Sequence, residues 1–434
     1  MGVSRYLHTL RQAWREWRTS PRFGFVRGHD YLTDHDLAQL EAGIGREDAQ
    51  TVERFERGFA RLVGDGDAVS FAAGRMGFYA ALKLFGLREG DEVVLQGATC
   101  SVMANAILRI GARPVYADID PETLGSSATA ILRVLTSHTR VIVAQHSFGI
   151  PCDIEPIAEL ARERGVLLVE DCALTLGSSI HGVVCGNFGD AAIFSTDHSK
   201  PLNTMTGGLV YTRDRELYTG LKKIQHESGE FSMEKQQALW DQLLFERKYC
   251  RPDRYGRMRL TAALRARLSH GAHPFADEDF GTAFSDSYAY PARMPAFLAA
   301  IGERELERWP ATVRHRKALL GQLSRFVEEE GGVRLPVAYH DSARDIVPLR
   351  LAWADEEAKQ IRESLKEVLD LSWTWFMQPV VATTEPLERF GYQSGMCPVS
   401  ERVGPNMINL PCNVGEAWGE ALVASLKAHV AGDA

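Results

Sequence analysis

Short apolar runs and amphipathic stretches alternate along the middle of the chain. The amphipathic stretches predict helices over 101–110 and 153–164, and each is followed by a glycine that can end a helix, Gly111 and Gly165. Alternation of this kind favours a mainly parallel sheet with helices on both faces. The runs that predict strands are 91–95, 114–118, 141–145, 167–170, 191–195 and 209–212. The proline that opens the second run is tolerated at the start of a strand.

Small or polar residues mark the carboxyl ends of the predicted strands. Gly74, Gln96, His146, Asp171 and Ser195 all fall at or just after such an end. Ligands of parallel sheets bind beyond the carboxyl ends of the strands. We therefore expect a functional site at this edge of the sheet.

The segment 166–208 carries the strongest candidate chemistry. One apolar run ends at Asp171 and another at Ser195, and Lys200 and a pair of glycines follow. An acid, a hydroxyl and an amine in this order suit pyridoxal phosphate (PLP): Asp171 would face the ring nitrogen, Ser195 the phosphate and Lys200 the aldehyde. Taken singly, the three could end a strand, satisfy a backbone group or lie in solvent. Their order and their placement at strand ends favour a site.

Composition and charge exclude several other classes of protein. The 434 residues include 45% hydrophobic and 24% charged ones, which is typical of a soluble globular protein with one large and one smaller domain. The net charge of −8 argues against general nucleic-acid binding. Seven scattered cysteines without metal-type spacing indicate neither a metal site nor structural disulfides, and so favour the cytoplasm. We find no apolar run of the roughly 20 residues that span a membrane and no signal peptide.

The first twenty residues have a basic amphipathic pattern. Apolar residues between Val3 and Trp17 recur at helical spacing, with arginines among them. Such a helix can lie on an anionic membrane surface. It can also pack against its own domain or a partner subunit, and we prefer this interpretation because apolar stripes are usually buried faces. Residues 1–34 are therefore expected to form an N-terminal arm.

Over about residues 35–425 the motifs together resemble the DegT-type sugar aminotransferases, PLP enzymes of the aspartate aminotransferase fold. The family's phosphate-binding turn matches Ala73-Gly74-Arg75, and its strand-end acid pair matches Glu170-Asp171. The other matching motifs are His146 with Gly149 and Asp153, Ser195 with Lys200, Tyr290 with Arg293 and Met294, and Asn409-Leu410-Pro411.

The resemblance implies an α/β fold of PLP-dependent transferase type I. In this fold a mainly parallel seven-stranded sheet lies between helices, and a smaller C-terminal α+β domain follows. We expect a large PLP-binding domain over 35–310 and a small domain over 311–434, joined by a helix at about 294–307. Family members build each active site from two subunits, which implies a homodimer with shared sites.

The resemblance also implies an activity. The protein would be an aminotransferase that moves an amino group from glutamate or glutamine to a keto-sugar, typically a nucleotide-linked one. The reaction would be ping-pong through an internal aldimine at Lys200, with Asp171 as the second catalytic residue. A lysine at position 200 favours transamination, because the family's dehydratases have histidine there. A transaminase or lyase acting on a non-sugar carbonyl compound and a non-catalytic PLP-binding regulator are the alternatives.

Departures from the family pattern affect the expected cofactor contacts. Leu174 replaces a glutamine, Cys100 an aromatic residue and Pro291 an asparagine. Arg75 could bind the phosphate or support the fold. The residues expected to bind the cofactor are Gly74, Arg75, Cys100, Asp171, Leu174, Ser195 and Lys200.

Three further residues are weaker candidates for contact with substrate: His146, His198 and Arg293. His146 could equally be a hydrogen-bonded structural histidine. His198 could carry a proton beside Lys200 or lie in a loop without a role, and we slightly prefer the latter.

A segment at about 228–287 is longer than the corresponding family loop. It is rich in arginine, including Arg247, Arg251, Arg254 and Arg257, with aromatic residues between them. It could grip an anionic acceptor such as a sugar diphosphate. It could instead be a helical insert packed over the dimer interface, which we slightly prefer.

Overall fold

A seven-stranded sheet organises the larger part of the molecule. The computed structural model describes residues 21–258, 261–262, 289–371, 374–383 and 385–431. All strands of this sheet point the same way except β9, which is antiparallel to both of its neighbours. The mainly parallel sheet expected from the sequence is therefore confirmed. In spatial order the strands are β1 (Asp67–Phe71), β9 (Gly208–Thr212), β8 (Ala191–Ser195), β5 (Leu167–Asp171), β4 (Thr139–Gln145), β2 (Glu92–Gln96) and β3 (Arg113–Ala117).

The position of β3 explains a proline within a strand. Pro114 pairs with Val93 of β2, and β3 has no neighbour on its other side. An edge strand tolerates a proline, which has no N–H to donate to a ladder. The strand runs from Arg113 to Ala117, one residue earlier than predicted at both ends.

Helices flank the sheet, and local signals set several of their ends. Gly165 ends α7 with a left-handed φ of 61°, as the glycine stop predicted. The predicted helix at 101–110 is α5 and closes one residue early. The helices of this part are α2 (Asp34–Ala42), α3 (Ala49–Val63), α4 (Gly74–Leu84), α5 (Ser101–Arg109), α6 (Ala128–Val134), α7 (Ile154–Arg164), α8 (Arg215–Glu227) and α9 (Met233–Tyr249).

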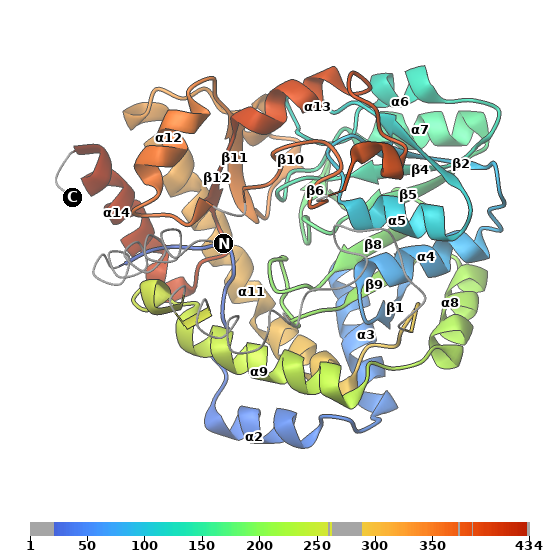
Figure 1. The fold of residues 1–434 in the computed structure, drawn as a ribbon, viewed down its shortest axis with the longest axis horizontal. Coiled ribbons are helices and arrows are strands. Elements are labelled where there is room, and N and C mark those ends of the chain that lie inside the picture. Colours follow the sequence, from blue (N-terminus) through green and yellow to red (C-terminus); the bar gives the residue numbers. More distant parts are fainter. Residues whose placement is uncertain (1–20, 259–260, 263–288, 372–373, 384, 432–434) are drawn as a thin grey trace, which may run out of the picture.

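The long helix α11 (Ala296–Arg325) joins the two parts of the protein (Figure 1). Its expected end at residue 307 was wrong, because the helix continues through Pro310. The N-terminal part of α11 contributes Leu298 to the core beside the large sheet, and the C-terminal part contributes Leu323 to a second core. Burial at both ends outweighs the loss of one hydrogen bond at the proline. The domain boundary expected near residue 310 thus lies within a continuous helix.

The second part holds a two-stranded sheet covered by helices. Its strands β11 (Arg350–Ala354) and β12 (Met407–Pro411) are antiparallel. Figure 1 shows this sheet beside α12 and α14, away from the large sheet. The mixture of strands and helices agrees with the α+β character expected. The helices are α12 (Ala358–Leu365), α13 (Pro398–Val403) and α14 (Gly419–Ala431), with short helical turns at Phe326–Glu330, Val337–Tyr339, Leu387–Phe390, Gly404–Asn406 and Glu416–Trp418.

A third, small sheet lies between the two parts. The order of its strands is β10 (Arg344–Asp345), β6 (Ser179–Ile180) and β7 (Val183–Val184). Because β10 follows α11 whereas β6 and β7 follow β5, this sheet ties the second part of the chain to the first.

The end of the N-terminal arm packs against the second part of the chain. Phe23 is buried, and its N–H donates to the carbonyl of Val368 at 2.9 Å. The amphipathic pattern itself falls in residues 1–20, which lie outside the described residues. The choice between a membrane and a protein surface therefore remains a prediction.

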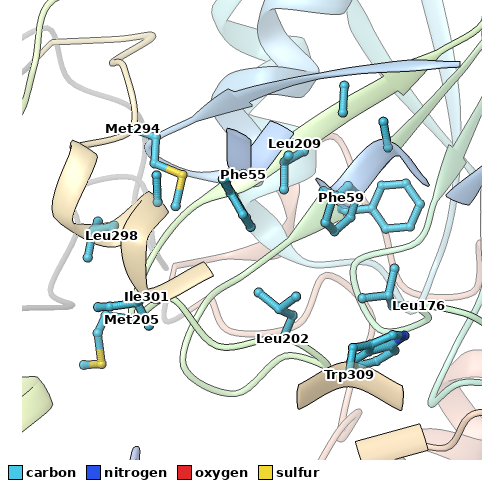
Figure 2. Packing of buried hydrophobic residues seen from close by; sticks show 14 of the residues in the cluster. Phe55, Phe59, Leu176, Leu202, Met205, Leu209, Met294, Leu298, Ile301 and Trp309 are labelled. Atoms are coloured by element: carbon cyan, nitrogen blue, oxygen red, sulfur yellow. The ribbon is translucent and has the colours of Figure 1, made fainter. Parts of the chain in front are cut away.

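The core beside the large sheet also supports the segment that carries Lys200. Leu202 and Met205 follow this lysine and are buried in the same cluster as Phe55, Phe59 and Trp309. Figure 2 shows these side chains packed between α3, α11 and the strands. Burial of these two side chains fixes the backbone of the connection between β8 and β9, so the lysine is carried by a well-supported loop.

Candidate active site

Two glycines bring the start of α4 against the end of β8. A Cβ atom on Gly208 would lie 2.3 Å from the Cα of Gly74, and one on Gly74 would lie 3.5 Å from the Cβ of Ser195. Ser195 is the last residue of β8 and pairs with Gly208. The free N–H groups at the start of a helix, together with a hydroxyl, make a good site for an anion. Gly74 and Ser195 are thus brought together where a phosphate group would fit.

Arg75 lies beside this cradle as the second residue of α4. Its backbone carbonyl accepts a hydrogen bond from Tyr290 Oη at 3.2 Å. Its positive charge acts on the Cys100 thiol, whose pKa it lowers against the larger, raising effect of burial. Arg75 therefore both supports Tyr290 and places a cation near the cradle.

Asp171 ends β5 with a buried carboxylate. Its Oδ1 accepts a hydrogen bond from the N–H of Ala173 at 2.9 Å. Burial raises the pKa of Asp171, and the hydrogen bond from Ala173 and the charge of Lys200 partly oppose this shift. A cation or a protonated ring nitrogen bound against this group would stabilise the carboxylate.

Cys100 lies among the three charged groups of the site. Burial raises the pKa of its thiol, Lys200 and Arg75 lower it, and Asp171 raises it further. All three charged groups therefore lie within electrostatic range of this thiol. The sequence-predicted residues Arg75, Cys100, Asp171 and Lys200 are therefore brought together by the fold.

Lys200 faces an aromatic residue from the other part of the chain. Its Nζ lies 5.5 Å from the centre of the Trp375 ring. The segment that follows Trp375 is tied to the end of β2, because Val381 N–H donates to the carbonyl of Thr99 at 2.7 Å. The site is thus closed on one side by the part of the chain beyond α11.

Leu174 differs from the other expected cofactor residues. It is buried three residues after Asp171, in the turn that the Thr175 N–H closes on Cys172. An apolar side chain can offer a cofactor only van der Waals contact. Any hydrogen bond that the family's glutamine makes at this position is absent from this chain.

His146 uses both of its ring nitrogens within the fold. Its Nδ1 accepts the N–H of Cys152 at 3.1 Å, so the proton lies on Nε2, which donates to Glu170 at 3.1 Å. Glu170 also accepts the N–H groups of Gly186, Phe188 and Gly189. Both ring nitrogens are engaged within the chain, which favours the structural interpretation of His146, and its contact with substrate stays a prediction.

His146 belongs to a cluster whose residue types could bind a metal ion, but its two ring nitrogens are not available as ligands. Potential ligand atoms of His146, Glu170 and Cys172 lie within 4.8 Å of one another. The bonds to Cys152 and Glu170 already occupy the imidazole. We therefore interpret this cluster as a hydrogen-bonded support for the segment that carries Asp171.

Arg293 is held by two carboxylates of its own chain. Its Nη2 lies 3.0 Å from Glu47 Oε1 and 3.2 Å from Glu230 Oε1. Contact with a substrate would have to compete with both ion pairs. The structure thus supports a role in tying this segment to the body of the subunit.

His198 is tied to the inserted segment. Its Nδ1 lies 2.8 Å from Oε1 of Glu246, a buried residue of α9 that also accepts a hydrogen bond from Gln242. Burial opposes the charged imidazole, but Asp197 and Glu246 together raise the pKa of His198 to about 9. Because a histidine with this pKa stays protonated at neutral pH, it is poorly suited to exchange protons there. It instead anchors the loop that carries Lys200.

This ion pair predicts a pH-dependent stability. The pKa of His198 is raised from 6.5 to about 9, so its stabilisation is complete below pH 6.5 and is lost as the pH rises to 9. Glu246→Gln should lower the free energy of unfolding by ~1–3 kcal/mol near pH 6. Urea denaturation at two pH values measures this effect. An equal difference from wild type at both pH 6 and pH 10 would contradict the assignment.

The described arginines of the insert contact their own chain. Arg247 donates to the carbonyl of Leu32, and Arg251 pairs with Asp253. Arg254 lies 3.8 Å from Asp253 and donates to the carbonyl of Lys248. The helix α9 packs on the body through Leu239, Trp240 and Leu243. These contacts favour a helical insert over an anion grip for the described residues of the segment. Its placement over a dimer interface stays a prediction, and residues 259–260 and 263–287 lie outside the described residues.

Sequence reasoning missed three residues that distant segments bring to this region. Trp375 faces Lys200 and is hydrogen-bonded to Asn409, both from the second part of the chain, and Glu246 of α9 holds His198. None lies at the end of a predicted strand of the large sheet, which was the signal that located the site. Asn409 did appear in a family motif, but without a role.

The fold is that of the PLP-dependent transferases of fold type I. A model of the DegT/DnrJ/EryC1/StrS aminotransferase family matches residues 37–416, so the chain belongs to that family. The structure also resembles that of DesV from S. venezuelae in complex with a ketimine intermediate. The TM-score is 0.67 at 21% identity, covering 92% of this chain and 94% of the other, so this likeness concerns the fold.

Two relatives are similar to this chain in sequence. One is dTDP-4-dehydro-2,3,6-trideoxy-D-glucose 4-aminotransferase of Saccharopolyspora spinosa, 30% identical over 66% of each chain. The other is GDP-perosamine synthase of Escherichia coli O157:H7, 38% identical over 38% of this chain and 46% of the relative. The matched regions thus span about two-thirds and about half of these relatives.

Within the part of the chain that the structure describes, none of the helices combines the length and the apolar character needed to cross a membrane.

Proposed function

We propose that this protein transfers an amino group from glutamate or glutamine to the carbonyl carbon of a nucleotide-linked keto-sugar, with PLP as cofactor. The observations that carry the proposal are that Lys200, Asp171 and Arg75 all act electrostatically on the Cys100 thiol, and that Gly74, the neighbour of Arg75, lies against Ser195 at the end of β8. Family membership supports the reaction class. The names of both relatives contain a nucleotide-linked sugar, which supports the acceptor.

The residues present fit the cofactor at three points. Ser195, Arg75 and the start of α4 would hold its phosphate. The buried carboxylate of Asp171, which accepts a hydrogen bond from Ala173, would hold a proton on the ring nitrogen. Lys200 would hold the aldehyde end. When bound, the cofactor supplies an electron sink and carries nitrogen between the two substrates.

The chain's own contribution to the reaction is proton transfer and orientation. The Nζ of Lys200 would take a proton from the α-carbon of the amino donor and deliver it within the first half-reaction, and in the second half-reaction it would deliver a proton to the acceptor carbon. The wall formed by Trp375 would help to exclude water from this Nζ.

We also propose a cytoplasmic homodimer. Support for the dimer comes from the family segment at Tyr290–Met294, and support for the cytoplasm comes from the free state of all seven cysteines. In a dimer with shared sites, each subunit would complete the site of the other. Gel filtration with light scattering measures the assembly directly.

A coupled product assay tests the proposed activity. Purified protein with PLP, glutamate and a nucleotide-linked 4-keto-sugar should release 2-oxoglutarate and an amino-sugar nucleotide in equal amounts. A panel of cyclitol ketones and simple keto acids serves as the control for acceptor class. Release of pyruvate and ammonia from cysteine, or no amino-sugar product with either glutamate or glutamine as donor and any acceptor, would contradict the proposal.

A further inference from the structure

The last part of the N-terminal arm meets the loop that carries Lys200. His29 is buried, and its Nε2 donates to the carbonyl of Asn203 at 2.9 Å. A carbonyl oxygen only accepts, so the proton of this imidazole lies on Nε2. In the other direction, Asn203 Nδ2 donates to the carbonyl of Arg27 at 3.0 Å. Two reciprocal hydrogen bonds thus tie the arm to a buried residue that follows Lys200 closely in the sequence.

The side chain of Asn203 carries this contact into the loop. Its Oδ1 accepts the N–H of Met205 at 2.8 Å. Met205 has a φ of 70°, in the left-handed region that is unfavourable for a residue with a side chain. Asn203 therefore holds a strained turn of the loop in place, and the bond to Arg27 fixes the orientation of the Asn203 amide.

Helix α9 of the inserted segment contacts both the arm and the loop. A Cβ atom on Gly28 would lie 2.4 Å from the carbonyl oxygen of Glu246, so the arm runs directly against this helix. Arg247 Nη2 donates to the carbonyl of Leu32 at 2.8 Å. Because the side chain of Glu246 also binds His198, the same turn of α9 is joined to the arm and to the loop that carries the lysine.

The arm lies outside the part of the chain that the family model matches, which begins at residue 37. The family motifs therefore do not account for its contacts with the loop. A lysine that moves protons between carbon atoms must be placed accurately, since a misplacement of about 1 Å caused by a distant substitution can cost about 10²-fold in rate. We propose that the arm positions Lys200 through His29 and Asn203. The inference rests on the proposed aminotransferase function and adds the support of its catalytic lysine.

Replacing His29 with leucine tests this positioning role. Leucine fills a similar volume but cannot donate to Asn203. We expect kcat for amino transfer to fall about 10- to 100-fold, and the KM for the keto-sugar to change by less than about 3-fold. His29→Gln offers a donor near the position of Nε2 and should keep kcat within about 3-fold of wild type. His35→Leu, at an exposed position of α2, is the matched control and should leave both constants unchanged.

Hydrogen exchange of the cofactor-free protein measures the loop without turnover. In His29→Leu the amides of residues 196–206 should exchange at least about 5-fold faster than in wild type, whereas those of β4 should keep the wild-type rate. Unchanged exchange at 196–206, or an equal increase throughout the described part of the chain, would overturn the positioning role.

A second variant keeps the test decisive if His29→Leu does not fold. Asn203→Ala removes the donor to Arg27 and the acceptor for Met205, so it should produce the same loss of kcat and the same local increase in exchange. Wild-type kcat in a folded Asn203→Ala enzyme would overturn the inference.

Binding of PLP separates this inference from the proposed function. Titration of the cofactor-free protein, followed by the visible absorbance of the bond to Lys200, should give a Kd about 3- to 10-fold higher in His29→Leu than in wild type. An unchanged kcat in a folded His29→Leu enzyme would overturn the positioning role and leave the function standing. If wild type binds PLP but forms no amino-sugar, the function is contradicted. The Kd then decides alone, with a raised value supporting the role of the arm and an equal value overturning it.

Discussion

Replacing Lys200 with alanine should reduce kcat for amino transfer by at least about 10⁴-fold. The substitution removes the amine that moves the proton, which alone is worth up to about 10⁴-fold, and it also removes the covalent anchor of the cofactor. The methyl group of alanine leaves the hairpin intact, since Leu202 and Met205 hold it through buried contacts. Steady-state rates with glutamate and a keto-sugar nucleotide measure the effect.

Lys223→Ala is the matched control for this substitution. Lys223 has a side chain 75% exposed on α8 and pairs only weakly with Glu227, at 4.0 Å. The control should keep wild-type activity and cofactor content. A Lys200→Ala enzyme that retains a tenth of the wild-type kcat would show that another group performs the proton transfer.

Replacing Asp171 with asparagine should lower kcat by about 10²- to 10⁴-fold while leaving the cofactor-free protein folded. The amide keeps an oxygen for the N–H of Ala173 but loses the charge that would hold a proton on the ring nitrogen. Asparagine is nearly the same size as aspartate, so the loss of activity would report the missing charge rather than altered packing.

The raised pKa of Asp171 predicts that Asp171→Asn does not destabilise the cofactor-free protein, although it lowers the activity. Burial raises this pKa above 3.8, so in the cofactor-free protein the contribution of the carboxyl group is favourable below pH 3.8 and is lost as the pH rises through the folded-state pKa. At neutral pH Asp171→Asn should therefore unfold at the same or a higher temperature than wild type. Calorimetry of both cofactor-free proteins measures this, and a large drop in Tm together with the lost activity would indicate a structural role instead.

The parts of the site that lie on the large sheet could be predicted from the sequence. Asp171 and Ser195 each end an apolar run, and Lys200 follows at a fixed distance, so a local pattern was enough. Gly74 was recognised in a motif, and the structure supplies the reason: its Cα lies against the backbone at Gly208. Hydrophobic periodicity carries this information because strand ends of a parallel sheet share one edge.

The remaining features depend on contacts between distant segments. Nothing in the local sequence shows that Glu246 reaches His198 or that Glu47 and Glu230 hold Arg293. The length of α11 was underestimated because the buried positions on its two ends belong to different cores. Asn409 stood in a recognised motif, yet its two accepted hydrogen bonds come from residues that only the folded chain brings near.

Covalent trapping of the cofactor tests the central claim most directly. The purified PLP-loaded protein is reduced with borohydride, digested with trypsin and mapped by peptide mass. The account requires a pyridoxyl-phosphate adduct on Lys200. An adduct confined to other lysines, or none on the peptide that contains residue 200, would contradict it.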